Sequence, residues 1–352
     1  MRLSDYYALL RENQFQIHPA RYPMSVLVGG CTLMNSVLAG FQNLTYGRRI
    51  DETELVAPPV FVVGHWRSGT TLLHELLALD DQLAFPSNFD AFIPHHFLIS
   101  RFFFYPLVSL LMPPRRPMDE MSMSVASPQE DDFALCASGA PTPYRRIAFP
   151  NRAHDDHQLL NLHNANDEQL LLLHNSLRRF FQQLTIQYGK RLVLKSPPHT
   201  GRIEKLSQWF PEARFIHISR HPYKLIPSTM RLWQLLDQLQ GFQLPKYATT
   251  ELQDYIFQCK DLMYAGYFSQ RGLLPANRLV EMRFEDLIAE PVVQLQSAYE
   301  RLELPHFEAL KPKIEAYFSQ KQNHKTNPLS IDKALQDRID LHWQDYKNAF
   351  GY

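Results

Sequence analysis

Four short, mostly apolar segments along the chain have the hydrophobic pattern of β-strands. Each is rich in valine, isoleucine, leucine or phenylalanine, and a turn or a helical pattern follows each one. Runs of this length are typical of strands buried in a parallel sheet. Recurring strand–loop–helix units predict an α/β fold with three layers, in which helices flank a central parallel sheet. The predicted strands are Val60–Val63, Arg191–Leu194, Arg214–Ser219 and Arg278–Arg283.

Helical patterns fill the regions before and between these strands. Residues 1–57 are predicted to form a helical N-terminal extension, which ends at Pro58-Pro59 because a proline pair cannot lie within a helix. Residues 80–190 form a long, largely helical insertion with clear periodicity in Glu168–Leu184. Because no repeat or flexible linker divides the chain, we interpret residues 1–352 as a single domain.

Two apolar stretches lie within these helical regions. Residues 24–41 carry no charge, but glycines and polar side chains dilute their hydrophobicity. This composition favours a buried or interfacial helix over a membrane-spanning one. Residues 97–112 include four consecutive aromatic residues, Phe102–Tyr105. They are interpreted either as a core or lid segment, or as the wall of a pocket for a lipophilic substrate or a membrane-surface contact.

The composition fits a globular protein of the cytoplasm. The chain has 352 residues, 45% of them hydrophobic, and balances 36 Lys and Arg against 36 Asp and Glu. A net charge of zero gives no reason to expect a nucleic-acid partner, so any anion site must be local. Cys31, Cys136 and Cys259 lack disulfide or zinc-site spacing. The polar first residues do not resemble a signal peptide, and we expect a reducing cytoplasmic location.

A phosphate-binding loop follows the first predicted strand. Residues 64–71 have the form GxxxxGTT and lead directly into a helical pattern. In such a strand–turn–helix, backbone N–H groups and the positive end of the helix dipole point at one spot. The hydroxyls of Ser68, Thr70 and Thr71 add further donors. The loop therefore predicts a bound anion.

The position of the cation separates this loop from that of nucleotide hydrolases. Those enzymes have Lys directly after the second glycine, where this chain has Thr70 after Gly69, and its cation is Arg67. The run RSGTTL after an apolar strand resembles the 5′-phosphosulfate loop of sulfotransferases that use 3′-phosphoadenosine 5′-phosphosulfate (PAPS). The resemblance implies a P-loop-like fold and PAPS as co-substrate, with no metal. It assigns the 5′ side of PAPS to Arg67, Ser68, Gly69, Thr70 and Thr71.

Three further segments match bacterial members of that family, so that the resemblance covers nearly the whole chain. They are SPQEDDF at residues 127–133, LVLKSPPHTG at residues 192–201 and FEDL at residues 284–287. The helical insertion, residues 80–190, stands where sulfotransferases form their acceptor site. The resemblance therefore implies transfer of a sulfuryl group to a hydroxyl, or an amine, of an acceptor that binds there.

A second anion site is expected for the 3′-phosphate that distinguishes PAPS from common nucleotides. Arg220 follows a predicted strand, and Ser228 comes eight residues later, which is the spacing by which sulfotransferases bind this phosphate. Pro227 suits the first position of a helix, and this would place Ser228 in the first turn. Lys325 stands where the family often has a basic loop that closes over the nucleotide, which gives it a possible binding role.

Sulfuryl transfer resembles phosphoryl transfer, in which positioning and cations supply most of the catalysis. We assign Arg67 as the catalytic cation, while Lys195 either assists at the leaving phosphate or forms an ion pair. A hydroxyl acceptor also needs a general base, and the candidates are Glu130, His96 and Asp90, in that order. An equally weighted alternative for Glu130 is a capping box, because Ser-Pro-Gln-Glu ends at this residue.

The acceptor is expected to be a small molecule, a lipid or a glycan. The run Phe102–Tyr105 favours a lipophilic alcohol, approached from a membrane surface, because four successive aromatic side chains on one helix cannot all face one core. That interpretation places the protein peripherally at the inner face of the membrane. Two alternatives stay open, namely a P-loop phosphotransferase or nucleotide kinase, and a non-catalytic nucleotide-binding protein associated with the membrane.

Overall fold

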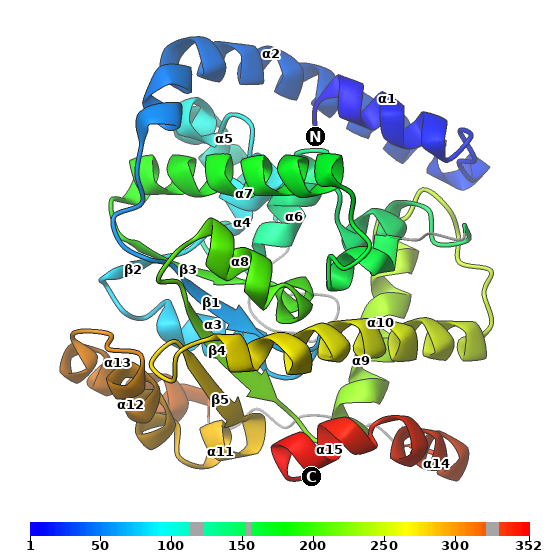
Figure 1. The fold of residues 1–352 in the computed structure, drawn as a ribbon. Coiled ribbons are helices and arrows are strands. Elements are labelled where there is room, and N and C mark those ends of the chain that lie inside the picture. Colours follow the sequence, from blue (N-terminus) through cyan, green and yellow to red (C-terminus); the bar gives the residue numbers. More distant parts are fainter. Residues whose placement is uncertain (113–122, 153–155, 322–330) are drawn as a thin grey trace. The chain divides into compact units, whose positions relative to one another are not determined.

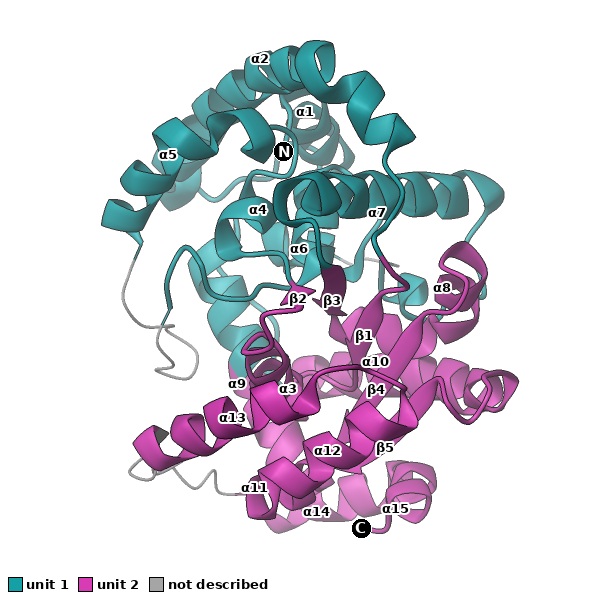
Figure 2. Cartoon of the chain, turned by 90° about the vertical axis from the view of Figure 1, so that its left-hand side faces the viewer, with its two compact units in different colours: residues 1–56, 85–190, 232–249 teal, residues 57–84, 191–231, 250–352 magenta. Residues whose placement is uncertain are grey.

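The computed structural model describes residues 1–352 except 113–122, 153–155 and 322–330. The chain divides into two compact units, coloured separately in Figure 2. Unit 1 comprises Met1–Val56, Phe85–Lys190 and Leu232–Thr249, and unit 2 comprises Ala57–Ala84, Arg191–Arg231 and Thr250–Tyr352. The chain thus passes from one unit to the other five times, after residues 56, 84, 190, 231 and 249. That the two behave as a single domain stays a prediction.

Unit 2 is built on a sheet of five parallel strands in the order β2-β3-β1-β4-β5 (Figure 1). Four of them confirm the predicted strands, with bounds that differ by one residue at most, and all four residues of β1 are fully buried. The fifth, β2, has only two residues, too few to produce a pattern in the sequence. The strands are β1 (Val60–Val63), β2 (Leu83–Ala84), β3 (Arg191–Lys195), β4 (Arg214–Ser219) and β5 (Leu279–Arg283).

Helices cover both faces of this sheet and complete the predicted three-layer α/β fold (Figure 1). On one face α10 packs its tyrosines against β4, where the ring of Tyr267 stacks on His217 at 4.3 Å between centroids. On the other face, α3 is joined to α13 by a hydrogen bond between Glu75 and Tyr317. The helices of unit 2 are α3 (Thr70–Leu77), α8 (Ile203–Trp209), α10 (Thr249–Gln270), α11 (Phe284–Ala289), α12 (Pro291–Arg301), α13 (Phe307–Lys321), α14 (Lys333–His342) and α15 (Gln344–Phe350).

Unit 1 is helical, and its long helix α7 shows how local sequence sets the bounds. The side chain of Asn166 accepts a hydrogen bond of 2.8 Å from the N–H of Gln169, which caps the first turn. Gly189 ends the helix at a φ of 61°, a conformation that favours glycine. The predicted periodicity in Glu168–Leu184 is thereby confirmed. The helices are α1 (Leu3–Glu12), α2 (Tyr22–Glu52), α4 (Asn88–Phe92), α5 (Phe97–Leu111), α6 (Asp131–Ala137) and α7 (Asp167–Tyr188).

The two apolar stretches form α2 and α5, and neither is a core helix. Within the described residues, one helical stretch, residues 19–52, is long and apolar enough to cross a membrane by length and composition alone, and only 6% of its most apolar window is buried. Phe102 and Phe103 on α5 are 83% and 73% exposed. The interpretations of these stretches as a buried helix and a core segment are therefore wrong, because their apolar side chains face outward.

Candidate active site

The turn between β1 and α3 needs glycine at two positions. Gly64 has a φ of 145°, and a Cβ there would lie 2.4 Å from the carbonyl oxygen of Ile218. Gly69 has a φ of 111°, directly before the first helical residue, and a Cβ would lie 2.4 Å from the ring of Phe284. Arg67, with a φ of 66°, also adopts the left-handed conformation. The backbone therefore folds into a tight turn that any side chain at either glycine would disrupt.

This turn presents unused hydrogen-bonding capacity to a ligand. Ser68 is fully buried, and within the described part of the chain no hydrogen-bond partner reaches its Oγ. A buried hydroxyl without a partner is costly, so such a group usually serves a ligand. Thr70 and Thr71 occupy the first turn of α3, where backbone N–H groups lack helical partners. The site thus has the donors that a phosphate or sulfate group requires.

Arg67, Arg220 and Ser228 meet beside this turn. The Nε of Arg67 donates a hydrogen bond of 2.9 Å to the Oγ of Ser228, and the Nη1 of Arg220 donates one of 3.1 Å to the backbone oxygen of Arg67. Burial lowers the pKa of Arg220, and the charge of Arg67 lowers it further. Two cations held this close favour an anion near both of them. The structure therefore brings together residues that the sequence analysis assigned to opposite ends of PAPS.

The helix that carries Ser228 begins earlier than expected. Helix α9 spans Pro222–Gln240, so Pro227 lies inside it and Ser228 belongs to its second turn. The placement of Pro227 at the first helical position was wrong because Pro222 occupies it instead, and proline is compatible with either site in the sequence. Thr229, the next residue, donates a hydrogen bond of 3.1 Å to the backbone oxygen of Trp66. This bond anchors α9 to the phosphate-binding turn.

Several residues that hold Arg220 were missed by the sequence analysis. Its guanidinium lies 4.4 Å from the ring centroid of Phe284, a cation–π arrangement, and its backbone N–H donates to the hydroxyl of Tyr346 at 2.9 Å. Glu285 accepts hydrogen bonds from the N–H of His221 and the hydroxyl of Tyr352. Only Phe284 and Glu285 carried a signal, since they belong to the FEDL segment.

Lys195 ends strand β3 at the same edge of the sheet. It is 1% exposed and pairs in register with Val62, two residues before the phosphate-binding turn begins. In the loop that follows, the Oγ1 of Thr200 accepts a hydrogen bond of 2.8 Å from the N–H of Gly64. The β3 loop therefore supports the turn directly, and the role of Lys195 at the leaving phosphate stays a prediction.

Glu130 belongs to unit 1 and is the N-cap residue of α6. The hydroxyl of Tyr144 donates a hydrogen bond to its Oε2, and the ring of Tyr144 stacks on Phe133 at 4.7 Å between centroids. The capping-box alternative is wrong, because α6 begins at Asp131 and Pro128 instead forms an isolated β-bridge with Ser87. Glu130 thus has a defined orientation, although its side chain makes no capping hydrogen bond to α6.

Asp90 is fully buried and already has several hydrogen-bond donors. Its carboxylate accepts from the N–H and hydroxyl of Ser87, from Arg101 at 2.8 Å and from Tyr188 at 2.6 Å. These donors already occupy both carboxylate oxygens and hold the side chain in place within unit 1. The geometry therefore supports a structural role for Asp90, while its assignment as general base stays untested.

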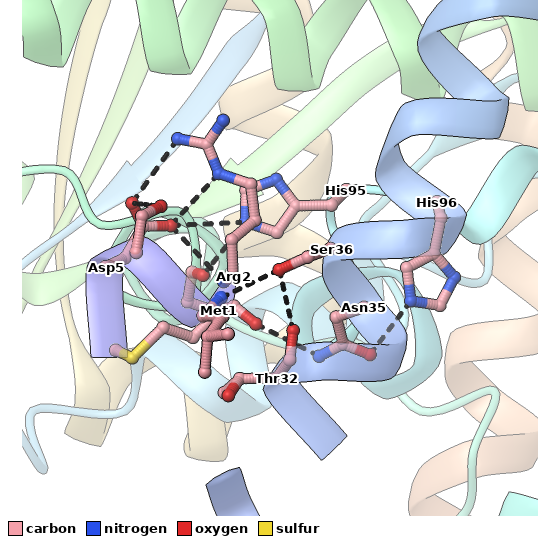
Figure 3. A network of polar contacts seen from close by, with 11 residues as sticks. Met1, Arg2, Asp5, Thr32, Asn35, Ser36, His95 and His96 are labelled. Carbon is pink, nitrogen blue, oxygen red and sulfur yellow. Dashed lines mark hydrogen bonds and ion pairs between the residues drawn. The ribbon is translucent and has the colours of Figure 1, made fainter. Parts of the chain in front are cut away.

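His96 is buried in a network that links α1, α2 and α5 (Figure 3). Its Nε2 lies 3.0 Å from the Oδ1 of Asn35, and its Nδ1 lies 2.9 Å from the Oγ of Ser100. Burial lowers the pKa of His96 to about 4. Both ring nitrogens of His96 therefore have protein partners, and its assignment as general base stays a prediction. The remaining predicted residue, Lys325, lies outside the described residues.

Comparison with known proteins finds similarity to sulfotransferases. A model of the sulfotransferase family matches residues 58–309. The omega-hydroxy-beta-dihydromenaquinone-9 sulfotransferases Stf3 of Mycobacterium bovis and Mycobacterium tuberculosis are each 38% identical to the chain over 349 residues, which cover 99% of this chain and 89% of theirs. Such coverage excludes a chance match to one motif.

Two solved structures share the fold. Sulfotransferase STF9 from Mycobacterium avium has a TM-score of 0.73 and 17% sequence identity, with 95% of this chain and 86% of that chain covered. Sulfotransferase STF1 from Mycobacterium tuberculosis H37Rv has a TM-score of 0.64 and 17% identity, with 88% and 87% covered. The family match and the 38% identity to curated sulfotransferases, rather than the shared fold, set aside the alternatives of a phosphotransferase and of a non-catalytic protein. The chain belongs to the sulfotransferase family and is an enzyme that transfers a sulfuryl group.

Proposed function

We propose that this sulfotransferase uses PAPS as donor and sulfates the hydroxyl of a lipophilic acceptor. The observation that carries the donor assignment is the meeting of Arg67, Arg220 and Ser228 beside the buried hydroxyl of Ser68, which has no hydrogen-bond partner among the residues that the structure describes. PAPS has anionic groups at both its 5′ and 3′ positions. A site with two neighbouring arginines fits PAPS better than it fits a ligand with a single phosphate group.

We assign each residue a role that its position supports. The hydroxyls of Ser68, Thr70 and Thr71, with the N–H groups around Gly69, bind the 5′ phosphosulfate, while Arg220 and Ser228 bind the 3′-phosphate. Arg67 stabilises the charge that develops on the transferred group, and Lys195 stabilises the leaving phosphate. When bound, PAPS supplies the sulfuryl group, and these side chains supply position and positive charge.

Glu130 is the proposed general base for the acceptor hydroxyl. Its hydrogen bond from Tyr144 fixes the carboxylate, and the stacking of Tyr144 on Phe133 fixes the tyrosine in turn. A base held in one orientation loses less entropy when it accepts the proton of a bound alcohol. Tyr144 is therefore a positioning residue.

The acceptor assignment rests on the relatives and on the exposed apolar helices of unit 1. The name of both curated relatives gives an omega-hydroxylated dihydromenaquinone as their acceptor. Such a molecule combines a lipophilic body with a hydroxyl group. We propose an acceptor of this class for this chain, and a cytoplasmic enzyme that contacts the membrane peripherally to reach it.

Mass spectrometry of the reaction products tests this function. The enzyme is incubated with PAPS and a hydroxylated menaquinone, and in parallel with the same quinone lacking the hydroxyl. We expect a mass gain of one sulfuryl group on the hydroxylated quinone alone. Sulfation of a soluble sugar, with no product from the hydroxylated lipid, would overturn the acceptor assignment.

A further inference from the structure

Helix α2 presents apolar side chains outward and polar side chains inward. In helices of soluble proteins the apolar face packs on the core and the polar face meets water. Here Thr32 and Gln42 are 2% and 1% exposed. The outward side chains recur at helical spacing along one stripe. Those of this stripe, each 40% to 83% exposed, are Val26, Leu27, Leu33, Met34, Val37, Phe41 and Leu44.

The polar side chains of α2 bind neighbouring helices of the same unit along much of its length. Gln42 donates to Gln183 on α7 at 3.2 Å and accepts from the N–H of Leu98 on α5 at 3.0 Å. The Oδ1 of Asn35 lies 3.0 Å from the Nε2 of His96. Figure 3 shows these two side chains pointing toward each other. The inverted pattern is therefore fixed by specific bonds to α5 and α7.

Helix α5, next to α2, has the same inversion. Its only charged side chain, Arg101, turns inward and donates to Asp90 at 2.8 Å. Buried Ser100 bonds within the helix and to His96. Apolar side chains cover the outer side of the helix. They are Phe102, Phe103, Leu107, Leu110 and Leu111, each 48% to 83% exposed. Helix α2 contacts α5 through Gln42 and the N–H of Leu98, and the exposed apolar side chains of the two helices are here together named the α2–α5 face.

Charged and aromatic residues mark the two ends of α2. No charge occurs from Tyr22 to Gly47, and arginines bound this stretch, with Arg21 before it and Arg48 and Arg49 after it. Tyrosines stand at the same ends, with Tyr22 beside Arg21 and Tyr46 two residues before Arg48. Arginine attracts anionic lipid headgroups, and tyrosine favours the interface between headgroups and acyl chains. Because Arg48 pairs with Glu52 at 2.7 Å, Arg21 and Arg49 are the arginines that this arrangement offers to the surface of an anionic bilayer.

We propose that the α2–α5 face docks on an anionic lipid bilayer, with α2 lying along the interface rather than crossing it. A crossing helix would take Asn35 and Gln42 away from their partners and into hydrocarbon, where unsatisfied polar groups are costly. Docking keeps those bonds and removes the apolar stripe from water. The docking proposal extends the proposed function, because docking would bring the enzyme to a lipophilic acceptor in the membrane. The evidence for docking itself is the α2–α5 face.

Vesicle flotation tests the docking. The full-length protein is mixed with vesicles of phosphatidylglycerol and phosphatidylcholine, and the fraction that floats is compared with that of the triple variant Leu44→Glu, Phe102→Glu, Leu110→Glu. The three sites are each 83% exposed, so the fold should persist. A matched control places Glu at Leu171, Leu273 and Leu341, which are exposed elsewhere. We expect flotation of the wild type and the control, and a loss of about tenfold or more in the triple variant.

Two results would overturn the proposal. One is a folded wild type that does not float with these vesicles. The other is a wild-type dimer by light scattering that the triple variant converts to monomer, which would show a second copy on this face. Binding of 3′,5′-adenosine bisphosphate and sulfation of a short, water-soluble alcohol are measured on every variant. A wild type that floats with the vesicles but shows neither activity would contradict the proposed function and leave the docking proposal standing.

Discussion

The side chain of Arg67 donates a hydrogen bond of 2.9 Å to the hydroxyl of Ser228, across 161 positions of sequence. This bond joins the phosphate-binding turn after β1 to the helix after β4. We assign Arg67 to the transferred group and Ser228 to the 3′-phosphate. Because the two side chains are bonded to each other, a mutation at one of them can disturb the binding of both ends of the donor. Mutations at one end should therefore be read with binding and turnover measured separately.

Arg67→Ala should lower kcat by roughly 100-fold or more, because it removes a cation that acts most strongly on the charge of the transition state. Arg67→Lys should recover part of that loss. Steady-state kinetics with PAPS and a soluble alcohol measure both, and circular dichroism checks the fold. Near-normal turnover in the alanine variant would remove Arg67 from the catalytic role.

Replacing Arg220 and Ser228 together by Ala should weaken binding of 3′,5′-adenosine bisphosphate by roughly 10- to 100-fold, the effect of losing charge-assisted hydrogen bonds. Binding of 5′-AMP should change far less, since it lacks the 3′-phosphate. Isothermal titration calorimetry with both ligands gives the comparison. Equal losses for the two would place these residues outside the 3′-phosphate site.

Gly69→Ala should abolish donor binding, because its Cβ would meet the ring of Phe284 and force a left-handed residue to carry a side chain. The displaced ring also lies under Arg220. Gly272→Ala is the control, since a Cβ there has no atom within 4 Å. Thermal shift with 3′,5′-adenosine bisphosphate should show stabilisation of the control only; a stabilised Gly69→Ala protein would be evidence against a tight turn.

Glu130→Gln should lower kcat for the hydroxyl acceptor while leaving donor affinity unchanged. Tyr144→Phe should lower kcat by a smaller factor, and in the double variant it should add no further loss to that of Glu130→Gln. The pH–rate profile distinguishes a base from a merely structural carboxylate, because only loss of a base removes the acidic limb. If Glu130→Gln keeps that limb and the wild-type kcat, the base lies elsewhere.

Acidification should destabilise the protein through its buried histidines. Burial lowers the pKa of His65 to about 4 and of His217 to about 3, from 6.5 in the unfolded chain. The unfolded state therefore binds more protons below pH 6.5, and stability falls as the pH drops from there toward 3. Melting temperatures from pH 7 to pH 4 measure the effect. His217→Phe, which keeps the stacking on Tyr267, should flatten the curve; an unchanged slope would mean that His217 is not buried neutral.

Four of the five strands and the phosphate-binding turn were predictable because local sequence determines them. The apolar run Val60–Val63 and the glycines after it permit little else. The start of α9 could not be predicted from the sequence, because Pro222 and Pro227 both suit a first helical turn. The contacts of Phe284 and Tyr346 with Arg220 depend on tertiary folding, and no local pattern records them. The sequence also did not show that the apolar side of α2 faces outward. Periodicity reveals an apolar stripe but not whether that stripe faces the core or the surface.

The most direct test of the account measures whether the sulfuryl group of PAPS reaches the acceptor. Purified enzyme is given PAPS carrying sulfur-35 together with an omega-hydroxylated menaquinone, and lipid extracts are separated and counted. We predict label in a single, more polar lipid, formed only with the hydroxylated acceptor and abolished by Arg67→Ala. A folded wild type that binds 3′,5′-adenosine bisphosphate but transfers no label to that lipid would contradict the proposed function.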